Sequence, residues 1–267
     1  MSNDRKQRAE QMRKEREKAD KRQRNVITIA IVAVVIALVG VGGYAVKSTA
    51  DKNAKSTDLV APKNTTKDYG IVYDQAAAES ADGGASDGGA ASGDAKPVSV
   101  EVYEDFQCPI CQQFEQVAGP MLKQQVAAGD ITLTYKPFSF LDDNNAGSPN
   151  DYSKRATNAA LCALDAGGVD DYVKVHDFLY ANQPQEGTAG PENPKLVEDL
   201  KSLGITGAGI DSCVKSEKFV PWVKKAREVA QDSDRKISGT PTVFVDGKKL
   251  DDFSPATIQK AVEEAKA

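Results

Sequence analysis

Histidine and cysteine are scarce in this chain of 267 residues. It has one histidine, His176, and four cysteines, and no cysteine precedes Cys108. Structural zinc sites usually combine two Cys-x-x-Cys pairs, or one such pair with two histidines. The single pair here, with one histidine in the chain, does not match those spacings, and we predict no metal site. The late first cysteine also excludes a lipid anchor on an N-terminal cysteine.

Acidic residues outnumber basic ones in most of the chain. The net charge is −5, yet residues 1–25 alone carry +5, so the remaining residues carry −10. Proteins that bind nucleic acid need clustered lysine and arginine to neutralise phosphates. We therefore predict no nucleic-acid partner for the acidic body of the protein.

Charge is absent from residues 26–46, a run of 21 residues that follows the basic N-terminal tail. About 20 apolar residues span a bilayer as a helix, and flanks rich in lysine and arginine stay on the cytoplasmic side. We therefore expect a cytoplasmic tail over residues 1–25, one transmembrane helix over 26–46, and all later residues outside the cytoplasm. The alternative is a cleavable signal peptide cut near Ala45, although its apolar region is usually shorter.

Two later segments contain few apolar residues. Residues 47–67 are polar, and we expect them to form a stalk. Residues 76–93 consist mostly of alanine, glycine, serine and aspartate, and that composition buries too little apolar surface to offset its conformational entropy. We expect this second segment to be a flexible insertion within a folded domain.

The rest of the chain alternates between strand and helix patterns. Alternating apolar residues predict strands, and apolar residues with a period near 3.6 predict helices. Strands are expected at 70–73, 98–106 and 131–138, a hairpin at 242–250, and helices at 152–166, 169–182, 194–203, 218–231 and after Pro255. A helix that Pro120 should kink is expected directly after residue 108. This order of elements indicates an α/β fold.

The Cys108-Pro109-Ile110-Cys111 motif lies where the strand at 98–106 gives way to a helix. Proline fits the first turn of a helix, which places Cys108 at the cap position and Cys111 inside the helix. Unpaired N–H groups and the positive end of the helix dipole then favour the Cys108 thiolate. A thiolate is the attacking species in disulfide exchange, and a second cysteine nearby resolves the mixed disulfide.

The residues alone leave other readings of the cysteines open. Cys108 and Cys111 could form half of a zinc site or a purely structural disulfide. An even cysteine count in an exported domain is compatible with two disulfides, against four separate buried thiols. Among these readings, the redox-active pair best explains a Cys-x-x-Cys motif at a helix N-terminus.

Two segments resemble one family in particular. They are residues 102–115, VYEDFQCPICQQFE, and residues 239–247, GTPTVFVDG. Both resemble the thioredoxin superfamily and, more narrowly, the DsbA-like, membrane-anchored oxidoreductases of Gram-positive actinobacteria. The resemblance covers residues 68–267 and implies a thioredoxin fold with an inserted helical domain at about 140–235.

The resemblance also implies roles for single residues. Cys108 would be the nucleophile and Cys111 the resolving cysteine. Pro241 would be a cis proline beside the sulfurs, and Thr240 would offer backbone groups to a substrate chain.

Further implications concern the surroundings of the motif and the partners. Pro109 and Ile110 would contact the substrate, and Cys162 and Cys213 would form a second, structural disulfide. The expected partners are exported client proteins with cysteines and a membrane protein that reoxidises the pair, and no cofactor is expected.

The sequence departs from the family pattern at two positions. Many members have histidine where this chain has Ile110, which adds no positive charge beside the thiolate. Thioredoxins have a buried acid six residues before the nucleophile, where this chain has Val102, so Glu104 or Asp105 is the candidate proton acceptor. We interpret His176 as a structural or surface residue and not as a catalytic base.

These observations favour an extracytoplasmic thiol–disulfide oxidoreductase that forms disulfides in exported proteins. One alternative is a disulfide reductase or isomerase, for example one that serves cytochrome maturation. Another is a non-catalytic, membrane-tethered metal-binding module.

The charge pattern makes a testable prediction about topology. Protease added to intact cells should remove the domain beyond residue 46 and leave the basic tail protected, because the tail is expected in the cytoplasm. Immunoblotting with antibodies to each end measures this, and lysed cells are the control. A domain that stays protected in intact cells would contradict the prediction.

Overall fold

The computed structural model describes residues 59–81, 96–143 and 147–266. The predicted tail at 1–25, the predicted membrane segment at 26–46 and most of the predicted stalk and flexible insertion lie outside the described residues. Within the described ranges, no helix is both long enough and apolar enough to cross a membrane.

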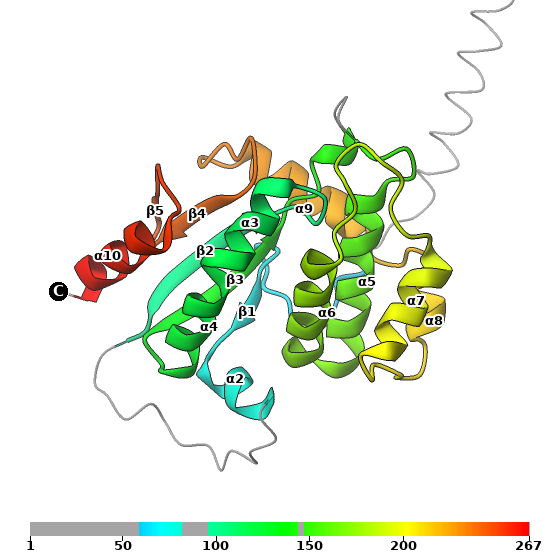
Figure 1. Cartoon of the computed structure of the whole chain (residues 1–267), viewed down its shortest axis with the longest axis horizontal. Helices are drawn as coiled ribbons and strands as arrows, with labels where there is room; N and C mark the ends of the chain where they lie inside the picture. The colour runs from blue at the N-terminus through cyan, green and yellow to red at the C-terminus, as the bar shows by residue number, and fades with distance from the viewer. Residues whose placement is uncertain (1–58, 82–95, 144–146, 267) are drawn as a thin grey trace, which may run out of the picture. The chain divides into compact units, whose positions relative to one another are not determined.

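Five strands form one mixed sheet in the order β1-β3-β2-β4-β5 (Figure 1). Strands β2 and β3 are parallel, and every other neighbouring pair is antiparallel. The bounds are Ile71–Tyr73 (β1), Val98–Glu104 (β2), Ile131–Pro137 (β3), Thr242–Val245 (β4) and Lys248–Lys249 (β5). The sheet confirms the predicted α/β class, with the strand that leads into the cysteine motif at its centre.

The link between the parallel strands consists of two helices, α3 (Pro109–Val117) and α4 (Gly119–Ala127). A parallel pair needs a crossover connection, and these helices lie over one face of β2 and β3 (Figure 1). The sequence predicted a single helix kinked at Pro120. The structure instead has a break at Ala118, and Pro120 lies in the first turn of α4, where a missing N–H leaves no helical bond unmade.

A helical domain is inserted between β3 and β4, within the range that the sequence predicted. It begins with a short 3-10 turn at Leu141–Asp143 and contains α5 (Tyr152–Gly167), α6 (Val169–Ala181), α7 (Asn193–Ser202), α8 (Ile210–Lys215) and α9 (Val220–Asp232). Helix α5 is buried from Tyr152 to Leu164 because the other four helices pack around it (Figure 1). The sequence did not predict α8, which is too short to display a helical period.

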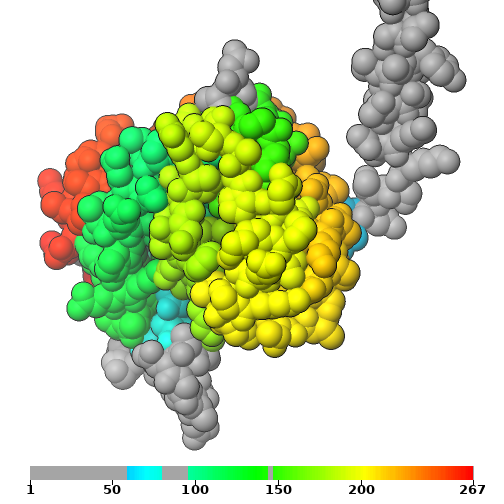
Figure 2. Space-filling model, turned by 45° about the vertical axis from the view of Figure 1, so that its right-hand side comes forward, coloured from blue at the N-terminus to red at the C-terminus, as the bar shows by residue number. Residues whose placement is uncertain are grey.

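The inserted domain packs directly against the thioredoxin-like part of the chain. Helix α6 contacts α3, β1 and the helix α2 (Gln75–Ala81). In the space-filling view, the yellow-green surface of α6 lies beside the green surface of α3 and α4 (Figure 2). The cysteine motif at the start of α3 is therefore close to both parts of the molecule.

Two predicted boundaries differ from the structure. Residues 59–67, expected in a stalk, belong to the folded unit, because the Lys63 N–H donates to Asp165 Oδ1 at 3.0 Å and Thr65 forms a β-bridge with Ile71. Residues 76–81, expected in the flexible insertion, form most of α2, whose Ala78 is buried. Packing against α4 and α6 supplies the burial that composition alone did not suggest.

The C-terminal elements agree with the sequence prediction. Asp246 and Gly247 form the two-residue turn between β4 and β5, with φ values of 46° and 76° that such a turn requires. Ser254 caps the last helix, α10 (Pro255–Lys266), through a hydrogen bond from the Thr257 N–H at 3.4 Å.

A disulfide joins Cys162 of α5 to Cys213 of α8. This is the pairing that the family resemblance implied. The two cysteines are 51 positions apart, and the closed loop contains α6, α7 and most of α8. Asn158, one turn before Cys162, accepts the Phe219 N–H at 2.8 Å and ties the end of this loop to α5.

Removing this disulfide should destabilise the protein. In the chain-entropy model, a bond that closes a loop of this length contributes about 4 kcal/mol. The double variant Cys162→Ala, Cys213→Ala should lose about that much free energy of unfolding, measured by urea denaturation with the Cys108–Cys111 pair reduced in both proteins. An unchanged midpoint would contradict this expectation.

Candidate active site

Cys108 lies at the junction between the central strand and α3. The strand β2 ends at Glu104, and the Cys108 N–H closes the following turn on the Asp105 carbonyl at 3.0 Å. The Cys108 carbonyl accepts the Gln112 N–H at 3.1 Å, which is the first bond of the helix. As the sequence predicted, Cys108 is the N-cap and Pro109 the first helical residue.

The two thiols have opposite electrostatic environments. A hydrogen bond with Cys111, supported by one with Thr240 and by the N–H groups of Cys111 and Ile110, lowers the pKa of Cys108 to about 6 against the opposing effect of burial. Burial raises the pKa of the Cys111 thiol well above its usual range, and the Cys108 and Glu104 charges act in the same direction. The arrangement therefore favours a thiolate on Cys108 and a thiol on Cys111.

Cys108 is less exposed than the sequence suggested. We expected an exposed nucleophile, but only 6% of Cys108 is accessible, compared with 0% of Cys111. The neighbouring Ile110 is 43% exposed. The cover arises from two loops that fold over the motif, one before β4 and one from the helical domain.

The loop before β4 contains a cis peptide bond between Thr240 and Pro241. Antiparallel pairing of β4 with β2 places Thr242 opposite Tyr103, so this loop reaches the start of α3. The Cys108 Sγ–H donates to the Thr240 carbonyl at 3.5 Å. The structure thus brings together the two segments that carried the family resemblance, although 132 positions separate Cys108 and Thr240.

The loop from the helical domain is held by glutamine side chains, which the sequence analysis missed. Gln183 Nε2 donates to the Cys108 carbonyl at 3.0 Å, and Gln112 Nε2 donates to the Tyr180 carbonyl at 2.7 Å. Gln107 Nε2 donates to the carbonyls of Gln185 and Thr188. Glutamines with no obvious pattern in the sequence therefore join the motif to the end of α6.

The Asp105 side chain is surrounded by hydrogen-bond donors of the protein. The side chain is fully buried and accepts hydrogen bonds from the N–H groups of Gln107 and Leu141 and from the Ser153 hydroxyl. Burial raises the pKa of Asp105 to about 7, although these hydrogen bonds favour the ionised form. Both oxygens are occupied in holding the turn before Cys108 against the helical domain.

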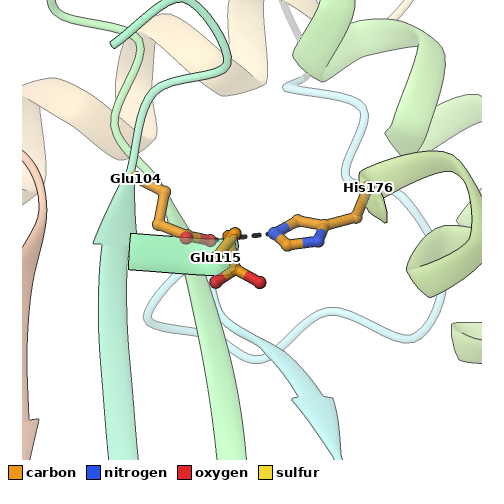
Figure 3. A group of neighbouring side chains, drawn as sticks. All are labelled: Glu104, Glu115 and His176. Carbon is orange, nitrogen blue, oxygen red and sulfur yellow. Dashed lines mark hydrogen bonds and ion pairs between the residues drawn. The ribbon is translucent and has the colours of Figure 1, made fainter. Parts of the chain in front are cut away.

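Glu104, the other candidate acid, lies in a buried cluster with Glu115 and His176 (Figure 3). His176 Nε2 is 3.0 Å from Glu104 Oε2, and the imidazole is completely buried. These three residues are the one set among the described residues that brings three ligand-type atoms within 4.8 Å of one another. Neither Cys108 nor Cys111 belongs to this set of three residues. Two of the three, His176 and Glu104, already share a hydrogen bond.

Comparison with known proteins gives a consistent family. Residues 86–264 match a family model described as thioredoxin. The chain belongs to this thioredoxin family.

One relative is named as a disulfide bond formation protein, and one similar solved structure is named DsbA. "Probable disulfide bond formation protein D" of Bacillus cereus is 27% identical over 205 residues, which cover 73% of this chain and 86% of the relative. DsbA from Mycobacterium tuberculosis superposes with a TM-score of 0.53 at 28% identity, over 62% of this chain and 81% of that one. This thioredoxin-family protein is accordingly a DsbA-like thiol–disulfide oxidoreductase.

A more distant structure supports the fold. The thiol–disulfide oxidoreductase MdbA from Corynebacterium diphtheriae has a TM-score of 0.57 and 20% identity, over 76% of this chain and 96% of its own. The shared fold includes the inserted helices as well as the sheet, because the match extends over nearly all of that protein.

The low pKa of Cys108 has a direct consequence for alkylation. Only the thiolate reacts, so the rate with iodoacetamide should rise as pH increases through about 6 and level off above it, whereas a free cysteine reaches its midpoint near about 8.5. Cys111→Ala should move the midpoint upward because it removes the main stabilising hydrogen bond. Ile110→Ala is the control and should leave it unchanged, and a wild-type midpoint near that of free cysteine would refute the assignment.

Proposed function

We propose that this oxidoreductase catalyses disulfide formation in exported proteins through Cys108 and Cys111. The observation that carries the proposal is the difference between the two thiols. A nucleophile whose pKa is lowered to about 6 lies beside a buried cysteine whose pKa is raised. Stabilising the thiolate stabilises the reduced form of the pair, and that makes the oxidised form a better oxidant.

The reaction follows from this asymmetry. A client thiolate attacks Cys108 Sγ of the oxidised pair, a client–Cys108 bond forms, the Cys108–Cys111 bond breaks, and Cys111 leaves as a thiolate that takes up a proton. A second client thiolate then attacks the client sulfur and releases Cys108 as a thiolate. The client loses two electrons and the cysteine pair gains them, and a membrane redox partner is proposed to reoxidise the pair.

The surroundings of Cys108 suggest how a client chain is held. Thr240 would offer its backbone groups to the client, with Pro241 beside the sulfurs. Pro109 and Ile110 would supply apolar contact next to the nucleophile. Both residues are exposed, Ile110 by 43%. Val117, further along α3, is 62% exposed and extends the apolar surface away from the motif.

The site of action is proposed to be outside the cytoplasm, next to the membrane. The Cys162–Cys213 disulfide supports this, because structural disulfides persist in oxidising compartments. The uncharged run at residues 26–46 would supply the single membrane anchor.

A reductase or isomerase is the second candidate, and Ile110 is the residue that favours it. Without a cation at this position, the thiolate depends on hydrogen bonds alone. We therefore expect a reduction potential nearer the isomerase value of about −180 mV than the strongly oxidising value of about −120 mV. A potential at or below about −270 mV, the thioredoxin value, would favour the reductase.

Trapping variants test the proposed roles. Cys111→Ala should accumulate clients disulfide-linked to Cys108, because no resolving thiol remains, whereas Cys108→Ala should trap few. Non-reducing electrophoresis of the membrane fraction measures both. Equal trapping by the two variants would contradict the assignment of nucleophile and resolving cysteine.

Oxidative refolding tests the direction of the reaction. Stoichiometric oxidised protein, added to a reduced and unfolded client, should accelerate disulfide formation over the uncatalysed rate. The double variant Cys108→Ala, Cys111→Ala is the matched control. No acceleration by the wild-type protein would sink the oxidase proposal.

A further inference from the structure

Cys111 requires a proton carrier inside the protein. It leaves as a thiolate when a client attacks Cys108, and it loses a proton again when the pair is reoxidised. Cys111 has no accessible surface, so water cannot reach the sulfur directly. A buried group next to Cys111 must therefore accept and return the proton.

Of the two acids at the end of β2, Glu104 is suited to this task and Asp105 is not. All the oxygens of Asp105 already accept hydrogen bonds, so a proton there would displace a donor. Glu104 is 7% exposed, its Oε2 faces His176, and its Oε1 is buried without a hydrogen-bond partner. The charge of Glu104 also acts on the Cys111 thiol. Glu104 thus has a free oxygen and is electrostatically coupled to the resolving cysteine.

A proton on Glu104 must also reach solvent, and His176 lies on the route. Its Nε2 is 3.0 Å from Glu104 Oε2, and its Nδ1 is 3.3 Å from Asp177 Oδ1. The Asp177 side chain is 48% exposed and pairs with Lys123. Asp177 and Lys123 line a surface cavity of about 390 Å³ together with Glu115. The imidazole therefore connects Glu104 to a side chain that is exposed to solvent.

We propose that His176 is the positioning residue for proton transfer at Cys111, because it holds the Glu104 carboxylate in place and connects it to solvent through Asp177. This inference rests on the proposed thiol–disulfide reaction. In each cycle the Cys111 thiolate takes a proton from this cluster as it leaves the disulfide, and it returns the proton when it attacks to re-form the bond. The cluster exchanges the proton with solvent, so no other reactant is consumed.

The charges around His176 support this role. Its ring lies among the rings of Tyr135, Tyr180, Phe106 and Tyr172, with centroid distances of 4.5 to 5.9 Å. Burial in this aromatic shell opposes a charge on the imidazole, yet the facing acids prevail and raise the pKa of His176 to about 10. The ionisable groups that face His176 are Glu104 of β2, Glu115 of α3, Asp177, Tyr172 and Tyr180 of α6, and Tyr135 of β3, with Lys123 of α4 behind Asp177.

Glu115 completes the cluster. It follows Cys111 by four positions on α3, so both side chains lie on the same face of that helix. Burial and the neighbouring Glu104 charge hold the pKa of Glu115 well above its usual range. The cluster thus brings an imidazole, a carboxyl group whose pKa is raised and a second acid with an unpaired buried oxygen within 4.8 Å of one another.

The test measures the resolving step alone. The reduced protein is converted to a mixed disulfide between Cys108 and glutathione, and the attack by Cys111 is followed from pH 5 to 9. In His176→Gln, which keeps a donor for Glu104 but removes the charge, we expect attack at pH 7 to slow by about tenfold or more. The rate should recover as pH rises, because hydroxide then removes the Cys111 proton directly.

Controls separate this role from a structural one. Tyr135→Phe keeps the ring packed on His176 and removes a hydroxyl that makes no hydrogen bond, so its rate should equal that of wild type. The thiolate midpoint of Cys108, read by ultraviolet absorbance, should stay near 6 in all variants. If His176→Gln does not fold, Asp177→Asn tests the inference instead, because it changes a half-exposed side chain. In that variant we expect the attack by Cys111 to slow at pH 7.

Several results would overturn the inference. One is a His176→Gln rate that matches wild type at every pH. Another is a His176→Gln variant whose rate of attack falls equally at all pH values and whose melting temperature is lower, because that pattern indicates a structural role. A wild-type rate that falls with a chelator and returns with added zinc would assign the cluster to a metal instead. Because glutathione replaces the client, failure of the oxidase proposal in the refolding assay leaves this readout intact.

Discussion

The first turn of α3, which presents the Cys111 thiol and backbone N–H groups to Cys108, is the feature on which the rest of this site depends. It lies at the end of the central strand, where β2 stops and the chain turns into a helix within four residues. At that point the N–H groups of Ile110 and Cys111 have no helical acceptor and face the Cys108 sulfur. The Cys111 hydrogen bond makes the largest contribution to the low pKa of Cys108, and these N–H groups add to it. A thiolate is thus stabilised without any cationic side chain in a motif with Ile110 in its third position.

The inserted helical domain makes hydrogen bonds to residues of the site as well as covering it. Gln183 binds the carbonyl of Cys108, and Ser153 binds Asp105 in the preceding turn. His176 reaches the carboxylate at the end of β2. These contacts come from three different segments of the insertion, so its packing determines both the accessibility of Cys108 and the surroundings of Cys111.

The two cysteines lie in unequal environments, although both belong to one turn at the start of α3. Cys108 faces the Cys111 thiol and the N–H groups of Ile110 and Cys111, whereas Cys111 is fully buried near the Glu104 charge. The first environment favours negative charge and the second opposes it. A pair with two equally exposed thiols would lack this difference, and with it the distinction between a nucleophile and a resolving cysteine.

Local pattern in the sequence determined the central elements. Alternating apolar residues predicted β2 and β3, and the position of Pro109 predicted Cys108 as the helix cap, because strand period and helix capping depend on neighbouring residues only. The resemblance of two short segments also indicated the cis bond at Pro241 and the pairing of Cys162 with Cys213. The boundaries at residues 59–67 and 76–81 could not be predicted, since those segments are ordered by helices distant in the chain.

Only the tertiary structure decided how the side chains around the cysteines are used. Nothing in the sequence distinguished Glu104 from Asp105, yet one has a free buried oxygen and the other has none. His176 lies 72 positions from Glu104, and its ion pair exists because α6 packs against the sheet. Strands, caps and motifs follow from neighbours along the chain, whereas burial, pKa and long-range contacts follow from which elements the fold brings together.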